Sequence, residues 1–99
     1  MSTDAPPRAA EFDLDRPWQL HPQVSVRPER FGALLYHFGT RRLSFLKSPA
    51  LLAVVQALES AGTARAACTA AGVAEHDLRS YAAALATLAS SQMIMERTP

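Results

Sequence analysis

The sequence predicts an α+β fold of the winged helix-turn-helix-like kind, with a three-stranded antiparallel sheet followed by three helices. Three observations predict it. Residues 24–27 alternate apolar and polar side chains, as a half-buried strand does. Residues 31–47 hold two apolar-rich stretches around Gly39-Thr40, and glycine at the first position of a two-residue loop is typical of a β-hairpin. After residue 48, apolar residues recur at spacings of three and four, the period of a helix.

The length of 99 residues suits one small domain, which we expect to span residues 12–99. Residues 1–11 contain proline, alanine and charged residues with almost no bulky apolar side chain, so they are predicted to be a disordered tail. Apolar residues then stand among prolines and polar residues up to residue 20. We expect this part to be an irregular segment that packs against the body of the domain.

Composition excludes several classes of protein. The formal net charge of +1 gives no general attraction to nucleic acid. No apolar run approaches the roughly 20 residues that span a bilayer, and the first residues lack the features of a signal peptide. We therefore expect a cytoplasmic protein without a membrane partner. Cys68 is the only cysteine, and in its alanine-rich surroundings it is predicted to be a small buried side chain.

A two-residue loop at Gly39-Thr40 fixes the register of the hairpin, with Tyr36 opposite Leu43 and Leu34 opposite Phe45. One face is then the more apolar and is the expected core face: Leu34, Tyr36, Phe38, Leu43 and Phe45. The opposite face carries Ala33, Leu35, His37, Arg42, Ser44 and Leu46.

The second arm of the hairpin is predicted to be an exposed edge strand, because no later segment reads as a strand able to cover it. With the loop-closing pair hydrogen-bonded, the backbone groups of Arg42, Ser44 and Leu46 are expected to point outward. An uncovered edge must be protected or used. The edge is basic, which fits either protection by charge or attraction of an acidic peptide that adds a strand. The predicted peptide-binding residues of this arm are Arg41, Arg42, Leu43, Ser44, Phe45, Leu46 and Lys47.

Three helices are predicted from capping residues and periodicity. Ser48 caps the first and Gly62 stops it, while Thr63 caps a second helix that Gly72 ends. A third helix is expected over residues 75–90. Beside its buried face lies a narrow stripe of mainly small residues that would let a peptide backbone approach, unless it reflects helix propensity alone. The stripe adds Arg79, Ala83 and Ala86 to the predicted peptide-binding residues.

The sequence contains no recognisable catalytic motif. The three histidines lack metal-ligand spacing, and no nucleophile is paired with a base, so we expect neither enzyme activity nor a cofactor or metal. A winged helix-turn-helix fold raises DNA binding, but the third helix opens with Glu75 and Asp77, where a recognition helix needs basic or amide side chains. A DNA-binding regulatory domain therefore remains the alternative, together with a small structural subunit whose edge pairs with its own copy.

The residues also resemble a known family. The blocks 18–22 and 27–47, with the stretches 66–73 and 85–89, are similar to the mycofactocin biosynthesis chaperones. The resemblance covers about residues 12–95. More distantly, the chain is similar to the pyrroloquinoline quinone peptide chaperone, and so to the recognition domains of ribosomally made, modified peptides.

The resemblance implies a function. Such chaperones bind the leader segment of a precursor peptide, which adds a strand beside the third strand and near the third helix. They deliver it to a radical S-adenosylmethionine maturase, perform no chemistry and hold no cofactor. We expect the maturase to meet the sheet face that carries Ala33, Leu35 and His37, which the helices cannot cover if they pack on the opposite face. The alternative is that Trp18 and Leu20 fold over this face.

Overall fold

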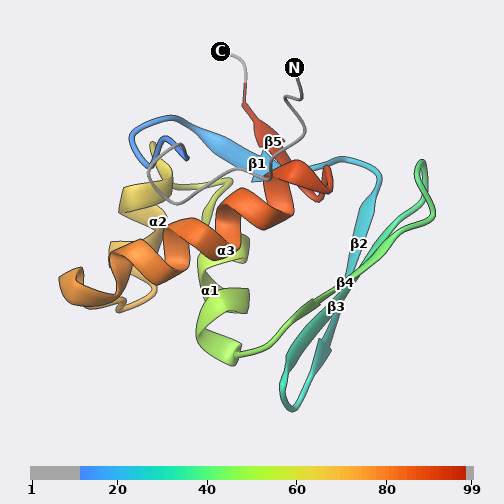
Figure 1. The fold of residues 1–99 in the computed structure, drawn as a ribbon, viewed down its shortest axis with the longest axis horizontal. Helices are drawn as coiled ribbons and strands as arrows, with labels where there is room; N and C mark the ends of the chain where they lie inside the picture. The colour runs from blue at the N-terminus through green and yellow to red at the C-terminus, as the bar shows by residue number, and fades with distance from the viewer. Residues whose placement is uncertain (1–11, 98–99) are drawn as a thin grey trace, which may run out of the picture.

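The computed structural model describes residues 12–97 and confirms the α+β architecture (Figure 1). The predicted tail over residues 1–11 lies outside the described residues. The elements are β1 (Trp18–Leu20), β2 (Val24–Glu29), β3 (Gly32–His37), β4 (Leu43–Leu46), α1 (Pro49–Ala57), α2 (Ala64–Ala70), the 3₁₀ turn η2 (Glu75–Asp77), α3 (Leu78–Ser90) and β5 (Ile94–Glu96). The strands β2, β3 and β4 form the predicted three-stranded antiparallel sheet in that order, and the three helices follow it.

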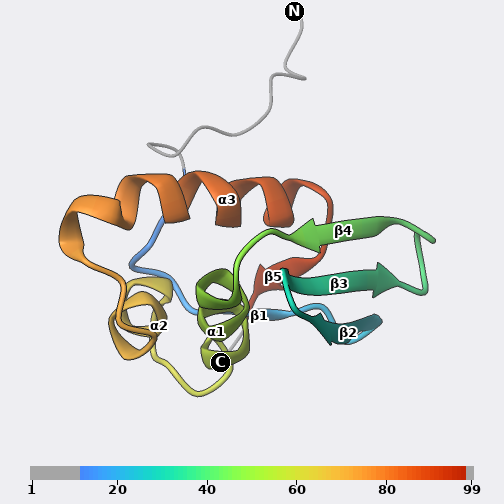
Figure 2. The same ribbon diagram turned by 90° about the horizontal axis from the view of Figure 1, so that it is seen from below.

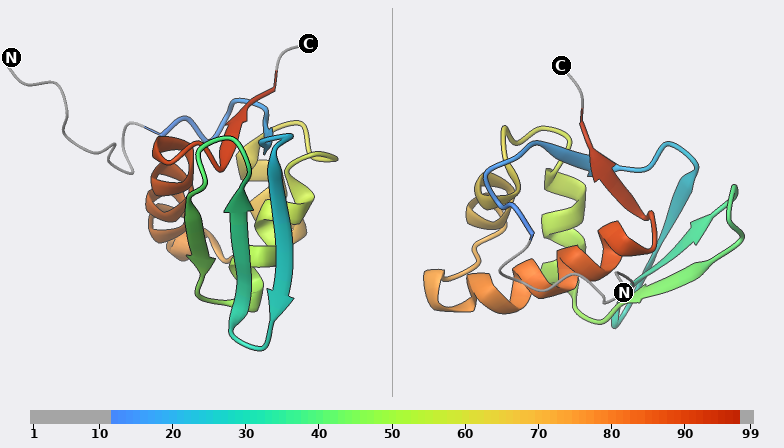
Figure 3. Two further views of the ribbon diagram at one scale, coloured as in Figure 1. Left: turned by 90° about the vertical axis from the view of Figure 1, so that its right-hand side faces the viewer. Right: turned by 45° about the horizontal axis from the view of Figure 1, so that its top comes forward.

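A second, two-stranded sheet was not expected. The strand β1 pairs with β5 in antiparallel register, with Gln19 opposite Met95. The segment before residue 20, predicted to be irregular, is therefore partly a strand. Its partner β5 comes from the other end of the described chain and lies beside it (Figure 3). Each strand has only three residues. That is too short for alternation of apolar and polar side chains to be recognised in the sequence.

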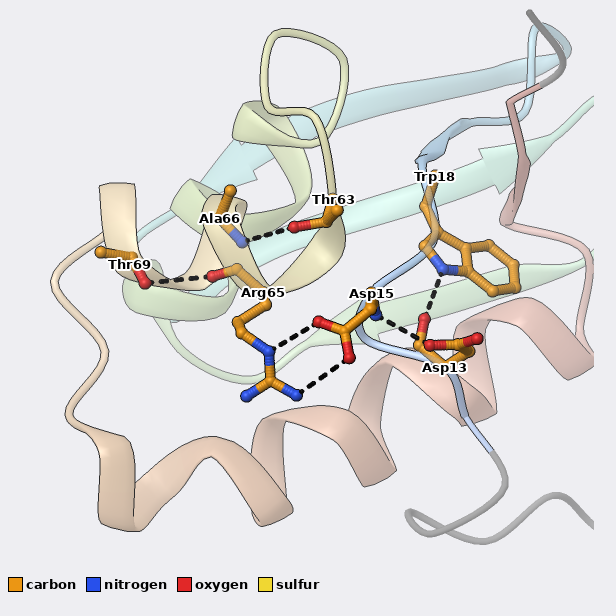
Figure 4. A network of polar contacts seen from close by, with 7 residues as sticks. All are labelled: Asp13, Asp15, Trp18, Thr63, Arg65, Ala66 and Thr69. Atoms are coloured by element: carbon orange, nitrogen blue, oxygen red, sulfur yellow. Dashed lines mark hydrogen bonds and ion pairs between the residues drawn. The ribbon is translucent and has the colours of Figure 1, made fainter.

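Polar contacts attach the segment before β1 to α2 (Figure 4). The Arg65 guanidinium donates to both carboxylate oxygens of Asp15, at 2.8 and 3.4 Å, and this hydrogen bonding holds the pKa of that carboxyl below its usual value. The Arg65 backbone N–H also donates to the Leu14 carbonyl at 2.8 Å. The indole N–H of Trp18 donates to the Asp13 carbonyl at 3.0 Å. The segment is thereby fixed against the helical half of the molecule.

The predicted helix caps are present, with one exception. The hydroxyls of Ser48 and Thr63 each accept a backbone N–H at 3.0 Å, at the starts of α1 and α2. Gly72 follows α2 with φ +83°, a conformation that favours glycine. The exception is Gly62, because α1 already ends at Ala57. Beyond that end, Arg97 donates to the carbonyls of residues 58, 59 and 61, and basic side chains stabilise such helix ends.

The predicted register of the hairpin is confirmed, but its two faces are the reverse of those expected. Tyr36 lies opposite Leu43 and Leu34 opposite Phe45, as predicted. The buried face, however, is the one with Leu35 and Leu46, both fully buried. The expected core face instead faces outward, and Phe45 on it is 60% exposed. The core is completed by α1, α3 and the partly buried Trp18 and Leu20, which is the alternative left open from the sequence.

The reversal of the two faces has a physical cause that is not apparent from the composition of the hairpin. Both faces of β3 and β4 carry apolar residues, and the less bulky one is packed against the helices. Gly32 has φ +149°, and a Cβ at this position would collide with the Leu46 carbonyl. This close approach, together with the small Ala33 beside it, brings the start of β3 against the end of β4 where α1 begins. Bulky aromatic residues are left for the other face.

Adjacent leucines of β3 test the assignment of faces. The Leu35→Asp variant places a charge in the core and should lower the free energy of unfolding by about 4 kcal/mol or more. The Leu34→Asp variant changes a half-buried side chain on the outer face and should lower it by only about 1–2 kcal/mol. Urea unfolding followed by circular dichroism measures both. If Leu34→Asp were the more destabilising variant, the faces would be those expected from the sequence.

Candidate peptide-binding site

A groove of about 450 Å³ lies between the edge of β4 and the helix α3. In Figure 2 the C-terminal end of α3 lies beside β4, and the left view of Figure 3 shows the helix next to this strand from the outer side of the sheet. Among the described strands, β4 has a partner on one side only, because the sheet order is β2-β3-β4. The groove is therefore bounded on one side by an unpaired strand edge. Its lining consists of Leu43, Ser44, Phe45, Leu46, Lys47, Leu51, Ala84, Thr87 and Leu88.

The floor of the groove is apolar. Leu51 reaches it from α1, and Leu88 reaches it from α3. Ala84 and Thr87 are small, so they leave room between the helix and the strand. A second hollow of about 250 Å³ shares Leu51 and Ala84 with the first and continues it toward Ser80, Tyr81 and Ser48. The combined groove can take apolar side chains of an extended segment that lies along β4.

The loop after β3 decides which backbone groups of β4 face this groove. The His37 N–H donates to the Arg42 carbonyl at 2.9 Å, so these two residues form a hydrogen-bonded pair. Hydrogen-bonded pairs alternate along an antiparallel ladder, which makes Leu35–Ser44 and Ala33–Leu46 the next such pairs. The N–H and C=O groups of Leu43 and Phe45 consequently point away from β3. The prediction that Arg42, Ser44 and Leu46 supply the outward groups is wrong.

Comparison with known proteins identifies the family of the chain. The chain matches the family model described as the Peptide chaperone MftB family over residues 17–95. It is 58% identical over 89 residues to the Peptide chaperone MftB of Mycobacterium tuberculosis, a match that covers 90% of this chain and 82% of that relative. The proteins of the same name from Mycobacterium ulcerans and Mycolicibacterium smegmatis are each 52% identical, over 96% and 89% of this chain and 91% and 86% of their own lengths.

The chain belongs to the MftB peptide chaperone family. This confirms the resemblance found in the sequence. Peptide chaperones are not enzymes, so the family also confirms the prediction that the chain has no enzyme activity. No solved structure gives a significant match.

The strand residues predicted for the peptide site of this family member fall into two groups. Those from Leu43 to Lys47 line the groove. Arg41 and Arg42 precede β4 and are exposed, but they do not line it. Arg41 has φ +62° and ends a four-residue loop, which replaces the predicted two-residue loop. The cause is His37, whose Nδ1 accepts the N–H groups of Gly39 and Thr40 at 3.0 and 3.1 Å.

The helix residues predicted for the site are displaced by one position. Ala86 is fully buried, and Arg79 and Ala83 are exposed without lining the groove. The residues that do line it are each one further along: Ser80, Ala84 and Thr87. One residue is about 100° around a helix, so the predicted stripe lies on a different side of α3. Leu51 was expected only in the core, and its half-buried state is what leaves part of it in the groove.

The predicted maturase surface is also wrong. Ala33 and Leu35 are fully buried, and His37 is 2% exposed. These side chains belong to the core and cannot form a docking surface. The sheet does have an open outer face, formed by the opposite set of residues (Figure 3).

Other kinds of site find no support within residues 12–97. That part of the chain contains no group of three or more histidine, cysteine or acidic residues that could hold a metal ion. None of the helices described there has the length and apolar character needed to cross a membrane. Cys68 is buried, and this burial raises the pKa of its thiol. Glu75 and Asp77 are exposed just before α3, where a recognition helix would meet phosphates.

Proline substitution tests which backbone N–H groups of β4 point to the groove and which are bonded to β3. Phe45→Pro removes an N–H that points to the groove, so it should lower the free energy of unfolding by about 1 kcal/mol. Ser44→Pro removes an N–H bonded to β3 and leaves a buried carbonyl unpaired, which should cost about 2–4 kcal/mol. Thermal unfolding of both variants measures the difference. A larger loss for Phe45→Pro would contradict the hydrogen-bond pattern described here.

Proposed function

We propose that this chain binds the leader segment of the mycofactocin precursor peptide as an added strand on β4 and presents it to a radical S-adenosylmethionine maturase in the cytoplasm. The observation that carries the proposal is the edge of β4, which no strand within residues 12–97 pairs, beside an apolar groove. The family assignment supports a peptide-chaperone role in mycofactocin biosynthesis. Three parts of the proposal go further than the family assignment. Binding of the leader segment and presentation to the maturase rest on the resemblance, and strand addition rests on the resemblance and on the geometry of β4.

Strand addition uses backbone groups that the fold leaves available. Leu43 and Phe45 each offer one N–H and one C=O toward the groove, which allows four hydrogen bonds to an extended peptide. Side chains of that peptide alternate between two sides. One set enters the groove over Leu51, Ala84 and Leu88, and the other set continues the outer face of the sheet. Main-chain bonds thus align the peptide along β4, and the groove selects apolar side chains.

The energies favour a moderate, reversible complex. Four hydrogen bonds at about 0.5–1.5 kcal/mol each contribute roughly 2–6 kcal/mol. Ordering a flexible peptide opposes this by about 2–5 kcal/mol. A dissociation constant near 1 μM corresponds to about −8 kcal/mol, so the side chains that enter the groove must supply most of the binding energy. A dissociation constant in this range suits a chaperone that must release its peptide to an enzyme.

Charge adds attraction for an acidic leader. Lys47 lines the groove, and Arg41 and Arg42 stand exposed at the opposite end of β4. None of the ion pairs found among residues 12–97 uses these three side chains. Exposed charges of this kind act chiefly on the rate of association and lose their effect as salt is added.

Calorimetry with the precursor peptide tests the proposal. The parent should bind with a dissociation constant near micromolar, and Phe45→Pro should weaken binding at least tenfold, about 1.4 kcal/mol, because it removes one donor and places a ring against the added strand. Phe45→Ala is the matched control: it removes the same aromatic side chain but keeps the N–H, so it should bind the peptide more tightly than Phe45→Pro does.

Two results would contradict the proposal. Equal affinity for Phe45→Pro and Phe45→Ala would exclude main-chain pairing at this edge. Tight binding of duplex DNA by the parent, without binding of the peptide, would favour the DNA-binding alternative instead.

A further inference from the structure

The outer face of the three-stranded sheet is apolar and open. The left view of Figure 3 looks onto this face, with the helices behind and beside it. Phe38 and Phe45 are each 60% exposed, Leu43 is 56% exposed, and Phe31 is 47% exposed. Leu34 and Tyr36, both partly exposed, lie between them on β3. Contiguous apolar exposure on this scale in a small soluble domain marks an interaction surface. We call these six residues the aromatic face.

The aromatic face is held in shape by its own contacts. Tyr36 and Phe38 pack edge to face, with ring centroids 5.0 Å apart. Phe31 and Phe45 pack at 6.2 Å. The first of these pairs belongs to β3 and the loop after it, and neither residue lines the peptide groove. Rigid aromatic side chains lose little freedom on binding, and such residues dominate the energetics of protein interfaces.

The charge around the aromatic face narrows the choice of partner. Residues 24–47, which form the sheet and its loops, contain five basic residues and one acidic residue, a net charge of +4. The single carboxylate, Glu29, is paired with Arg27 at 2.9 Å. Two copies of the chain packed face to face would bring two such positive surfaces together, which is unfavourable. A surface with an apolar centre and an acidic rim complements this face.

We propose that the aromatic face is the docking surface for a folded protein with an apolar, acid-rimmed surface, and that this protein is the maturase. The identity of the partner rests on the proposed function above. The face and the peptide groove share β4 but use different parts of it, because side chains of Leu43 and Phe45 form the face while their backbone groups form the edge. A peptide added at that edge continues the face. The enzyme would therefore contact chaperone and peptide together.

The test is a double variant of β3 and its loop, Tyr36→Thr with Phe38→Thr. It removes two aromatic side chains from the face and leaves the groove unchanged. Surface plasmon resonance with the maturase holoenzyme should show binding about 10- to 100-fold weaker than for the parent. Calorimetry should show precursor-peptide affinity within about twofold of the parent. Met95→Thr, which alters a 37% exposed side chain on β5, is the matched control and should bind the enzyme as the parent does.

The alternatives give different results. Unchanged enzyme binding by the double variant, in a parent that binds both partners, overturns the assignment of this face alone. A parent that binds the peptide but not the enzyme overturns both the docking proposal and presentation, while peptide binding stands. A parent that does not bind the peptide overturns the proposed function, and retained, face-dependent enzyme binding would then still support the docking surface. Two further results would overturn the proposal. Self-association of the parent in sedimentation equilibrium, if the double variant abolishes it, would assign the face to a second copy of the chain. Binding of the parent to phosphatidylserine vesicles, if the double variant abolishes it, would assign the face to a membrane.

Discussion

The hydrogen bond from the His37 N–H to the Arg42 carbonyl determines which backbone groups of β4 face outward at the edge of the sheet. It makes residues 37 and 42 the last hydrogen-bonded pair of the hairpin, and alternation along the ladder fixes every later pair. Leu43 and Phe45 are then the residues whose backbone groups face α3. The His37 imidazole supports this arrangement by accepting two N–H groups of the loop while it is itself buried. In the same register, a two-residue loop closed by a hydrogen-bonded Phe38–Arg41 pair would instead turn the backbone groups of Arg42, Ser44 and Leu46 toward the groove.

The division of the sheet into three surfaces follows from this constraint. One face is buried against the helices, the edge of β4 borders an apolar groove, and the aromatic face is open. Because the chain is small, its core can cover only one face of the sheet. The two-stranded sheet β1–β5 and the Arg65–Asp15 contact lie away from the three-stranded sheet and its groove, on the far side of the core. An edge and a face that meet at one strand allow peptide and enzyme to be bound side by side.

The sequence predicts the parts of this structure that depend on local rules. Ser48 and Thr63 cap helices because their hydroxyls suit that position. The register of the hairpin follows from the centre of its turn at Gly39-Thr40, although the loop has four residues and not the predicted two. The faces of the hairpin could not be chosen in this way, because both carry apolar residues and the more apolar one is used for the surface. The strands β1 and β5 lie more than seventy residues apart in the chain and are too short to show a period.

The same limit applies to the site. A periodic pattern defines a stripe on α3 only to within one residue, and this error separates the buried Ala86 from the groove residue Thr87. The edge strand itself was predictable, since nothing after residue 47 reads as a strand that could cover it. The direction of its backbone groups was not, because it depends on the imidazole of His37 accepting hydrogen bonds from the loop.

Amide hydrogen exchange, resolved by residue with NMR spectroscopy, tests the central claim most directly. In the free protein, the amides of Ser44 and Leu46 should exchange slowly because they are bonded to β3, whereas those of Leu43 and Phe45 should exchange quickly. Addition of the precursor peptide should slow exchange at Leu43 and Phe45 at least tenfold, equivalent to about 1.4 kcal/mol. Unchanged exchange at both residues in the bound complex would contradict strand addition at β4.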